Sequence, residues 1–154
     1  MNVNGDGREV YPWTSYQERT RFDISKLAQW EIVFNHMQKK GMVLHIVLQE
    51  SENDKMLNQG NLGVERKLYY RELIARFAHH NGVYWNLGEE TNRSTSQIKV
   101  DADFFKSNDP YRHPVKVHSK AGSTSVDNLY NPLLGDLNFD ATSLQQPSTV
   151  THSL

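Results

Sequence analysis

The chain has 154 residues, with 17 basic and 18 acidic side chains and a formal net charge of −1. Because the two signs are mixed along the chain, it lacks the basic surface that attracts nucleic acid or an anionic membrane, and neither is expected as a partner. Cysteine is absent, which excludes disulfides, thiolate nucleophiles and cysteine-based zinc sites but leaves the cellular compartment undetermined.

A chain of this length can form one domain with a real core and bury roughly 70% of the surface that it exposes when unfolded. No run approaches the roughly 20 apolar residues that span a bilayer. Residues 1–7 have neither the basic nor the apolar part of a signal peptide. We therefore expect one globular domain without a membrane span and without an export signal in this chain, although a longer parent protein could be exported.

The first predicted helix covers about residues 24–40. Asp23 has the side chain of a helix N-cap, apolar residues follow at helical spacing, and Gly41 suits the position just after the helix end. Residues 42–48 then form a nearly continuous apolar run, rich in β-branched side chains, which is typical of a parallel strand buried on both faces. His45 lies inside this run and is predicted to be a core histidine.

A polar loop over residues 51–63 leads to a second predicted helix. Its apolar face has helical spacing and consists of Leu68, Tyr69, Leu73, Ile74 and Phe77. The segment 79–82 ends this helix, and residues 83–87 form the next predicted strand. In that strand Trp85 is expected to be a core residue.

The second half of the chain is predicted to repeat this alternation in a weaker form. After a loop at 91–96, the spacing of apolar residues predicts a short helix that stops before a proline turn, and the strand 115–118 follows. Residues 122–138 are expected to be mostly loop. Residues 139–144 are expected to form a fourth, weaker strand, and the tail at 146–154 has no recognisable pattern.

Alternating helices and strands with short helix-to-strand links favour an α/β fold with right-handed βαβ units and a parallel sheet. The predicted strands end in polar or ionisable side chains, namely Gln49 and Glu50, Glu89 and Glu90, and His118. In open parallel sheets and in barrels alike, ligands bind at the carboxyl-terminal edge. We therefore expect the chemistry at this edge, with Gln49, Glu50 and His118 as candidate substrate-binding residues.

The paired carboxylates Glu89 and Glu90 are the leading catalytic candidates. A strand end gains nothing in packing from two adjacent acids, because like charges repel and each loses hydration on burial. In a cleft, however, a glutamate can act first as general acid and then as general base. Gly88, just before the pair, would let the backbone approach closely or adopt an unusual φ.

Residues 84–91 resemble the fourth-strand segment of clan A glycoside hydrolases, which are (β/α)8 barrels. In that family an apolar strand ends in Asn-Glu-Pro, and the glutamate of this motif is the acid/base. The resemblance implies that Glu90 is the acid/base, while Glu89 and Thr91 stand where the family has Asn and Pro. The choice between Glu89 and Glu90 as the acid/base stays open at this point.

The wider chain is similar to apiosidase-like glycosidases, in which such a barrel is flanked by an immunoglobulin-like domain and a collagen-binding domain. The similar segments lie within residues 11–14, 22–31, 48–54, 65–73 and 85–90. The resemblance implies a partial (β/α)8 TIM barrel, with residues 1–145 as a partial catalytic domain and 146–154 outside it. The second to sixth barrel strands would then be residues 1–3, 42–48, 83–87, 115–118 and 139–144.

A complete (β/α)8 barrel needs about 250 residues, so the chain would hold only its middle part. The resemblance places the second catalytic carboxylate after the seventh strand, beyond Leu154. The implied reaction is hydrolysis of O-glycosidic bonds in a poly- or oligosaccharide without a cofactor, and the chain alone is expected to be nearly inactive. A partial barrel would also expose sheet edges and an apolar interior face, which predicts self-association.

A second hypothesis belongs to a different functional class. The chain could be a non-catalytic carbohydrate-binding or interaction module, either as a degenerate half barrel or as an open doubly wound sheet. Trp13 is a candidate sugar platform by ring stacking, with core packing as the alternative. For His79 and His80 the sequence shows no third ligand at metal spacing, so no metal site is expected.

Overall fold

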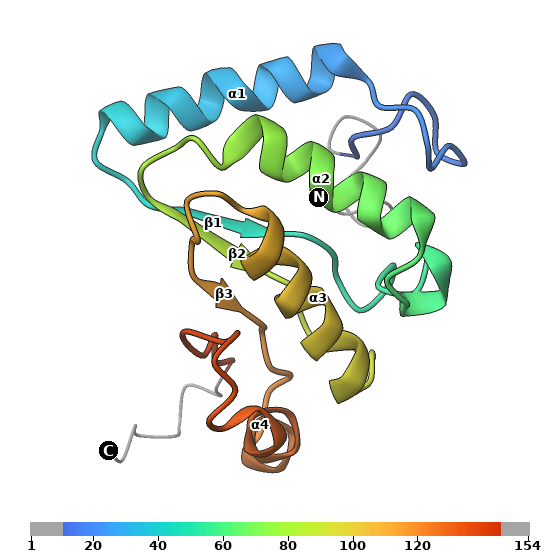
Figure 1. Cartoon of the computed structure of the whole chain (residues 1–154), viewed down its shortest axis with the longest axis vertical. Coiled ribbons are helices and arrows are strands. Elements are labelled where there is room, and N and C mark those ends of the chain that lie inside the picture. The colour runs from blue at the N-terminus through green and yellow to red at the C-terminus, as the bar shows by residue number, and fades with distance from the viewer. Residues whose placement is uncertain (1–10, 146–154) are drawn as a thin grey trace.

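The computed structural model describes residues 11–145, so the predicted strand end at 1–3 and the tail at 146–154 lie outside the described residues. Helices and strands alternate along the described chain (Figure 1). The longer helices are α1 (Ile24–Lys39), α2 (Val64–Phe77), α3 (Thr95–Asn108) and α4 (Ser123–Tyr130). The strands are β1 (Leu44–Val47), β2 (Val83–Asn86) and β3 (Val115–Lys116). Two short 3-10 helices are η1 (Asn58–Gly60) and η2 (Asn131–Leu133).

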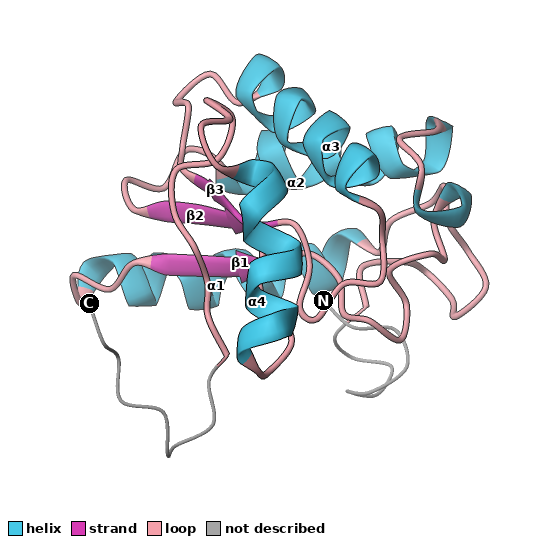
Figure 2. Ribbon diagram, turned by 90° about the horizontal axis from the view of Figure 1, so that it is seen from below, coloured by secondary structure: helices cyan, strands magenta, loops and turns pink. Residues whose placement is uncertain are grey.

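The described strands form one parallel sheet in the order β1-β2-β3 (Figure 2), which confirms the predicted α/β class. β1 is joined to β2 through α2, and β2 is joined to β3 through α3. Because both crossovers step in the same direction along the sheet, right-handed connections place α2 and α3 on the same face. A doubly wound sheet needs a reversal of strand order, and these three strands show none.

The helix ends follow the chemistry expected from the sequence. The Asp23 carboxylate accepts hydrogen bonds from two backbone N–H groups in the first turn of α1, as predicted. Gly41, just after α1, has a φ of 74°, a left-handed conformation that glycine adopts without steric cost. A capping box between Ser94 and Gln97 begins α3. Within residues 11–145, each helix is too short or too polar to span a lipid bilayer.

The core lies between the helices and one face of the sheet, which alternate strand residues form. The strand residues on this face, all at most 5% exposed, are Leu44, Ile46, Val83, Trp85 and Val115. Trp85 packs on Phe105 of α3 with ring centroids 5.1 Å apart, and Phe34 of α1 packs on Phe77 of α2 at 4.9 Å. Such aromatic pairs bury large apolar surfaces and fix the helices against one another. The predicted core position of Trp85 is confirmed.

The opposite face of the sheet is only partly covered by the described residues. His45 on this face is exposed and Lys116 is half-buried. The predicted burial of residues 42–48 on both faces is therefore wrong, as is the core position of His45, because the helices cover one face only. Partial desolvation and the nearby Lys116 and His118 lower the pKa of His45. The neutral ring can then accept a hydrogen bond at Nε2 from Asn86 Nδ2, 3.1 Å away.

The predicted fourth strand, residues 139–144, runs beside β3 without forming a regular strand. Asp140 pairs with Val115 partly through its side chain, because its Oδ2 accepts the Val115 N–H at 2.7 Å. Further along, a single parallel bridge joins Ser143 to His118. The Asp140 carboxylate therefore accepts the Val115 N–H, which a backbone carbonyl would accept in a regular strand. The segment lies where a fourth strand was expected, but the expectation of a regular strand is wrong.

Residues 122–138, predicted to be mostly loop, contain α4 and η2. Val126, Leu129 and Tyr130 have helical spacing, and all three pack in or against the core. The Tyr130 hydroxyl donates a hydrogen bond to the Val117 carbonyl at 2.7 Å, which fixes α4 beside the end of β3. The segment also contains Gly, Pro and Asn, which favour turns. These residues led to the prediction of a loop despite the helical spacing.

A buried carboxylate organises the turn between α3 and β3. Asp109 Oδ2 accepts hydrogen bonds from Trp85 Nε1 at 2.8 Å and from the His113 N–H at 3.1 Å. His113 Nδ1 lies 2.8 Å from the same oxygen. Burial alone would raise the pKa of Asp109, but these hydrogen bonds and one from Tyr111 outweigh it and lower the pKa below the usual 3.8. The fold therefore favours the charged carboxylate.

We expect Asp109→Asn to reduce the acid sensitivity of folding. Because the pKa of Asp109 is lower in the folded than in the unfolded chain, its contribution to stability is fully present above about 3.8 and is lost as the pH falls through the lower folded value. In urea unfolding between about pH 5 and about pH 2, the free energy of unfolding should fall more steeply for the wild type than for the variant. Asp103→Asn, at an exposed position of α3, should keep the wild-type slope. Identical slopes for Asp109→Asn and wild type would refute this role.

Candidate functional site

The structure brings the carboxyl ends of the strands together at one edge of the sheet. The Glu89 N–H donates to the Gln49 carbonyl at 2.8 Å, and the His118 N–H donates to the Gly88 carbonyl at 3.0 Å. Glu50 and Glu89 also pair as a parallel bridge. The three chain segments that carry the candidate residues therefore lie side by side, and we term this edge the rim.

Glu89 and Glu90 are both half-buried at the rim. The unusual φ expected at Gly88 occurs instead at Glu90, whose φ is 47°. This left-handed conformation is uncommon for a residue with a side chain. The extended backbone therefore does not continue from Glu89 through Glu90. Asn86, which is buried at the end of β2, accepts the Gly88 N–H at its Oδ1 at 3.2 Å. This hydrogen bond fixes the backbone just before the two acids.

Gln49 and Glu50 follow β1 and have different surroundings. Gln49 is 2% exposed, and its Oε1 accepts a hydrogen bond from Arg66 Nη1 at 2.5 Å. Its Nε2 donates to the Asn53 carbonyl at 2.8 Å, so both polar groups of this side chain are occupied within the protein. Glu50 is half-buried. Gln49 therefore supports the rim, whereas Glu50 is partly exposed there.

Trp13 lies in the core of the described structure. It is 1% exposed and packs on Tyr69 of α2, with ring centroids 5.5 Å apart, and on Phe22 at 6.5 Å. A sugar can stack on an aromatic ring only where a face of the ring is open. The structure thus replaces the sugar-platform prediction for Trp13 with a packing role.

His118 is half-buried at the rim and contacts the segment that runs beside β3. Its Nδ1 lies 2.9 Å from Ser143 Oγ, and its Nε2 lies 3.2 Å from Gln145 Oε1. A pocket of about 320 Å³ opens beside it, and Asn92 and Lys120 are among the other residues that line this pocket. A polar ligand in this pocket would therefore contact the rim at His118.

A buried network beneath the rim was not foreseen from the sequence. Asp54, which is 1% exposed, accepts hydrogen bonds at Oδ2 from the Asn92 N–H at 2.5 Å and from Thr91 Oγ1 at 3.0 Å. Asp54 lies in the loop after β1, whereas Thr91 and Asn92 lie in the loop after β2. This carboxylate therefore ties together the two loops that border Glu89 and Glu90.

Two arginines and one carboxylate lie deeper in the same network. The fully buried Asp101 of α3 accepts hydrogen bonds from Arg93 Nη1 and from Tyr70 Oη, the latter at 2.6 Å. Arg66 Nη1 of α2 lies 3.7 Å from the same carboxylate oxygen. Arg93 Nη2 donates to the Leu87 carbonyl at 2.7 Å. The network thus fixes the chain just after β2, immediately before the candidate acids.

Burial and neighbouring groups set the charge states in this network. Burial raises the pKa of Tyr70 to about 12, so its hydroxyl keeps the proton that it shares with Asp101. Burial alone would lower the pKa of Arg93, but the neighbouring Tyr70 and Asp101 raise it, and the guanidinium stays charged. The sequence spacing of Arg66 and Tyr70 indicates that they share one face of a helix. Their common partner, Asp101 of α3, is distant in the sequence and could not be found from spacing.

Three carboxyl groups lie close together along the chain segments of the rim. Glu50, Glu89 and Glu90 come from two neighbouring strand ends and are all half-buried. A carboxyl group in such a position can donate a proton to a bound substrate and then accept one from water. The buried network beneath the rim holds the loops that carry these groups, as a preorganised site requires.

Sequence and structure comparisons do not assign the rim to a known type of site. Comparison of the chain with family models, with curated proteins and with solved structures gave no match.

Proposed function

We propose that the chain is part of a (β/α)8 glycoside hydrolase domain in which Glu90 is the general acid/base and Glu89 supports it. The proposal starts from the resemblance of residues 84–91 to the acid/base strand of that family. The fold supports it, because parallel neighbours in sequence order with their helices on one face are the repeating unit of such a barrel. The second catalytic carboxylate would come from a later strand outside this chain.

The observation that carries the proposal is the meeting of the strand ends at the rim. Barrel enzymes build their active sites from the carboxyl ends of several strands. Here Glu50, Glu89 and His118 come from three neighbouring ends, and Glu90 adds an acid in the turn just beyond. In this proposal Glu50 and His118 are candidate contacts for the sugar, and Gln49 supports them from a buried position.

In the proposed mechanism, Glu90 protonates the oxygen of the scissile glycosidic bond as that bond breaks. In the same step the second group, a carboxylate, either attacks the anomeric carbon or takes a proton from the attacking water. The two carboxyl groups are about 5–5.5 Å apart for retention and about 6.5–9.5 Å apart for inversion. In the retaining case, the Glu90 carboxylate next takes a proton from the water that hydrolyses the intermediate. The substrate class is a poly- or oligosaccharide.

The test is hydrolysis of an oligosaccharide panel by a protein that continues the barrel beyond Leu154, measured as reducing ends released. Activity is expected in the wild type and in Glu52→Gln, because Glu52 is an exposed acid in the neighbouring loop. Activity should be lost in Glu90→Gln. Equal activity in Glu90→Gln and in the wild type would contradict the proposal.

The partly uncovered face of the sheet favours a second candidate function, that of a non-catalytic interaction module. Val43 is 52% exposed just before β1, and the alternation of strand residues places it on the same face as the exposed His45. Apolar surface of this kind on an open sheet promotes association. The chain by itself is therefore expected to self-associate through this face.

Val43→Lys is expected to raise the monomer fraction in sedimentation velocity across a concentration series, because a charged side chain on this face would lose its hydration when the face is covered. Ile32→Lys is the matched control. Ile32 is 71% exposed but lies on the outer surface of α1, so its replacement should leave association unchanged. A wild-type chain that stays monomeric at every concentration would rule out this surface as an interface.

A further inference from the structure

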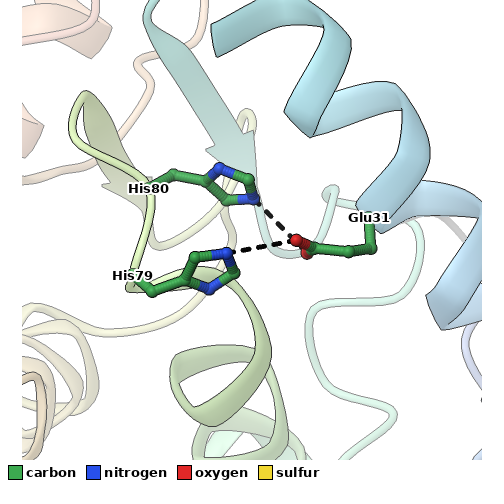
Figure 3. Close-up of side chains that lie close together, drawn as sticks. All are labelled: Glu31, His79 and His80. Atoms are coloured by element: carbon green, nitrogen blue, oxygen red, sulfur yellow. Dashed lines mark hydrogen bonds and ion pairs between the residues drawn. The ribbon is translucent and has the colours of Figure 1, made fainter.

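A cluster of one carboxylate and two imidazoles lies at the end of the sheet opposite the rim (Figure 3). Glu31 comes from α1, while His79 and His80 follow α2 and precede β2. Glu31 Oε1 lies 3.1 Å from His79 Nε2, and Glu31 Oε2 lies 3.3 Å from His80 Nε2. Glu31 is 49 positions away from His80 in the chain, so spacing in the sequence could not reveal the third member.

Hydrogen bonds around His80 determine which ring nitrogen carries its proton. Gln38 Oε1 accepts the Asn81 N–H at 2.9 Å, so this atom is an acceptor. His80 Nδ1 lies 3.2 Å from the same oxygen and must therefore be the donor. In the neutral ring, the lone pair of His80 Nε2 then faces Glu31 Oε2, which is another acceptor. A ring nitrogen and a carboxylate oxygen that direct lone pairs toward each other are arranged like two ligands of one cation.

The spacing of the ligand atoms suits zinc. Zn²⁺ binds imidazole nitrogen and carboxylate oxygen at about 2.0–2.2 Å in a tetrahedron, which sets neighbouring ligand atoms about 3.3 Å apart. His79 Nε2 lies 3.1 Å from Oε1 of Glu31 and His80 Nε2 lies 3.3 Å from its Oε2, each close to this edge. With one ligand atom taken from each residue, the three atoms lie within 4.8 Å of one another. Gln38 Oε1 is the kind of outer partner that fixes the ring of a metal-binding histidine.

The cluster is anchored on one side and open on the other. The His80 side chain is 0% exposed, whereas the side chains of Glu31 and His79 are 32% and 48% exposed. An ion could therefore reach the cluster from solvent, and water could complete its coordination. A site with three protein ligands and a water molecule is an established arrangement for zinc.

We propose that Glu31, His79 and His80 bind one Zn²⁺ ion that stabilises the packing of α1 against the turn between α2 and β2. The proposed role is structural, because the three ligands join α1 to the segment between α2 and β2. The proposal does not depend on the glycoside hydrolase proposal. The competing explanation is a metal-free ion pair between Glu31 and protonated histidines, and it gives no dependence on zinc.

Calorimetric titration of the chelator-treated full chain with zinc chloride tests the proposal, together with thermal unfolding with and without zinc. One site per chain is expected, and Tm should rise by about 5 °C or more when zinc is about 100-fold above Kd. His79→Asn and Glu31→Gln should weaken binding by more than the about 10- to 100-fold that loss of an outer partner costs. His36→Asn removes an exposed histidine of α1 and should bind zinc like the wild type.

The two half-exposed ligands are better targets than His80, because His80 is buried against Phe34 with ring centroids 6.0 Å apart and its loss would disturb the core. Cobalt gives a second readout, since tetrahedral Co²⁺ absorbs visible light far more strongly than hydrated Co²⁺. That absorption should appear in the wild type and in His36→Asn and be absent in His79→Asn. Failure of the wild type to bind zinc, or equal zinc affinity in the wild type, His79→Asn and Glu31→Gln, would overturn the proposal.

Discussion

Glu90→Gln is expected to lower kcat/KM by about 10²- to 10⁴-fold for a glycoside with a poor leaving group, in a protein that includes the later barrel strands. Glutamine keeps nearly the same shape but cannot supply the proton that the departing oxygen needs. The loss should be much smaller for an activated aryl glycoside, because that leaving group departs without protonation. A loss that depends on the leaving group identifies the acid and distinguishes it from a residue needed only for folding.

Glu89→Gln is the matched comparison for this experiment, because Glu89 is the adjacent acid and is also half-buried. We expect a smaller loss of kcat/KM that is similar for both leaving groups, since Glu89 supports Glu90 and does not transfer the proton. If Glu89→Gln alone shows the leaving-group dependence, the two roles are exchanged. If the loss of kcat/KM is the same for both leaving groups in both variants, neither Glu89 nor Glu90 is the acid/base.

Asp101→Asn is expected to destabilise the fold by about 3–5 kcal/mol. The substitution leaves the guanidinium groups of Arg66 and Arg93 buried without the carboxylate that both contact. An uncompensated buried charge costs far more than the net gain from an intact pair. For a chain of this size the corresponding fall in Tm is about 10 °C, which thermal unfolding followed by circular dichroism would detect.

Asp103→Asn is the control on the same helix, because Asp103 is exposed and its replacement should change stability by no more than about 0.5 kcal/mol. A double variant with Arg93→Met and Asp101→Leu removes two charges together, although Arg66 stays. We expect this double variant to be more stable than Asp101→Asn alone. Wild-type stability in Asp101→Asn would mean that another interaction holds the chain after β2.

Features set by neighbouring residues could be predicted from the sequence. The cap at Asp23, the glycine after α1 and the apolar face of α2 each involve residues a few positions apart, so spacing alone indicated them. The meeting of Glu50 with Glu89 could also be predicted, because the carboxyl ends of neighbouring parallel strands must lie at the same edge. The local sequence pattern and the parallel order of the strands were therefore sufficient to predict the fold class and the meeting of the strand ends at the rim.

Features that depend on distant residues could not be predicted in this way. An apolar run does not distinguish one covered face from two, which is why His45 was placed in the core. The sequence does not decide between stacking on a sugar and packing for Trp13, because its packing partner on α2 is far along the chain. The ladder position taken by Asp140 and the burial of Asp101 with two arginines likewise join segments that no local spacing connects.

Glu90 occupies a backbone conformation that glycine would adopt without strain. For a residue with a side chain, the left-handed conformation costs about 1–2 kcal/mol, and glycine avoids this cost. The candidate acid therefore stands at a position where the backbone conformation favours glycine. A glycine at this position would relieve the backbone strain but remove the carboxylate, so under the proposed function Glu90→Gly is expected to raise stability and abolish activity together.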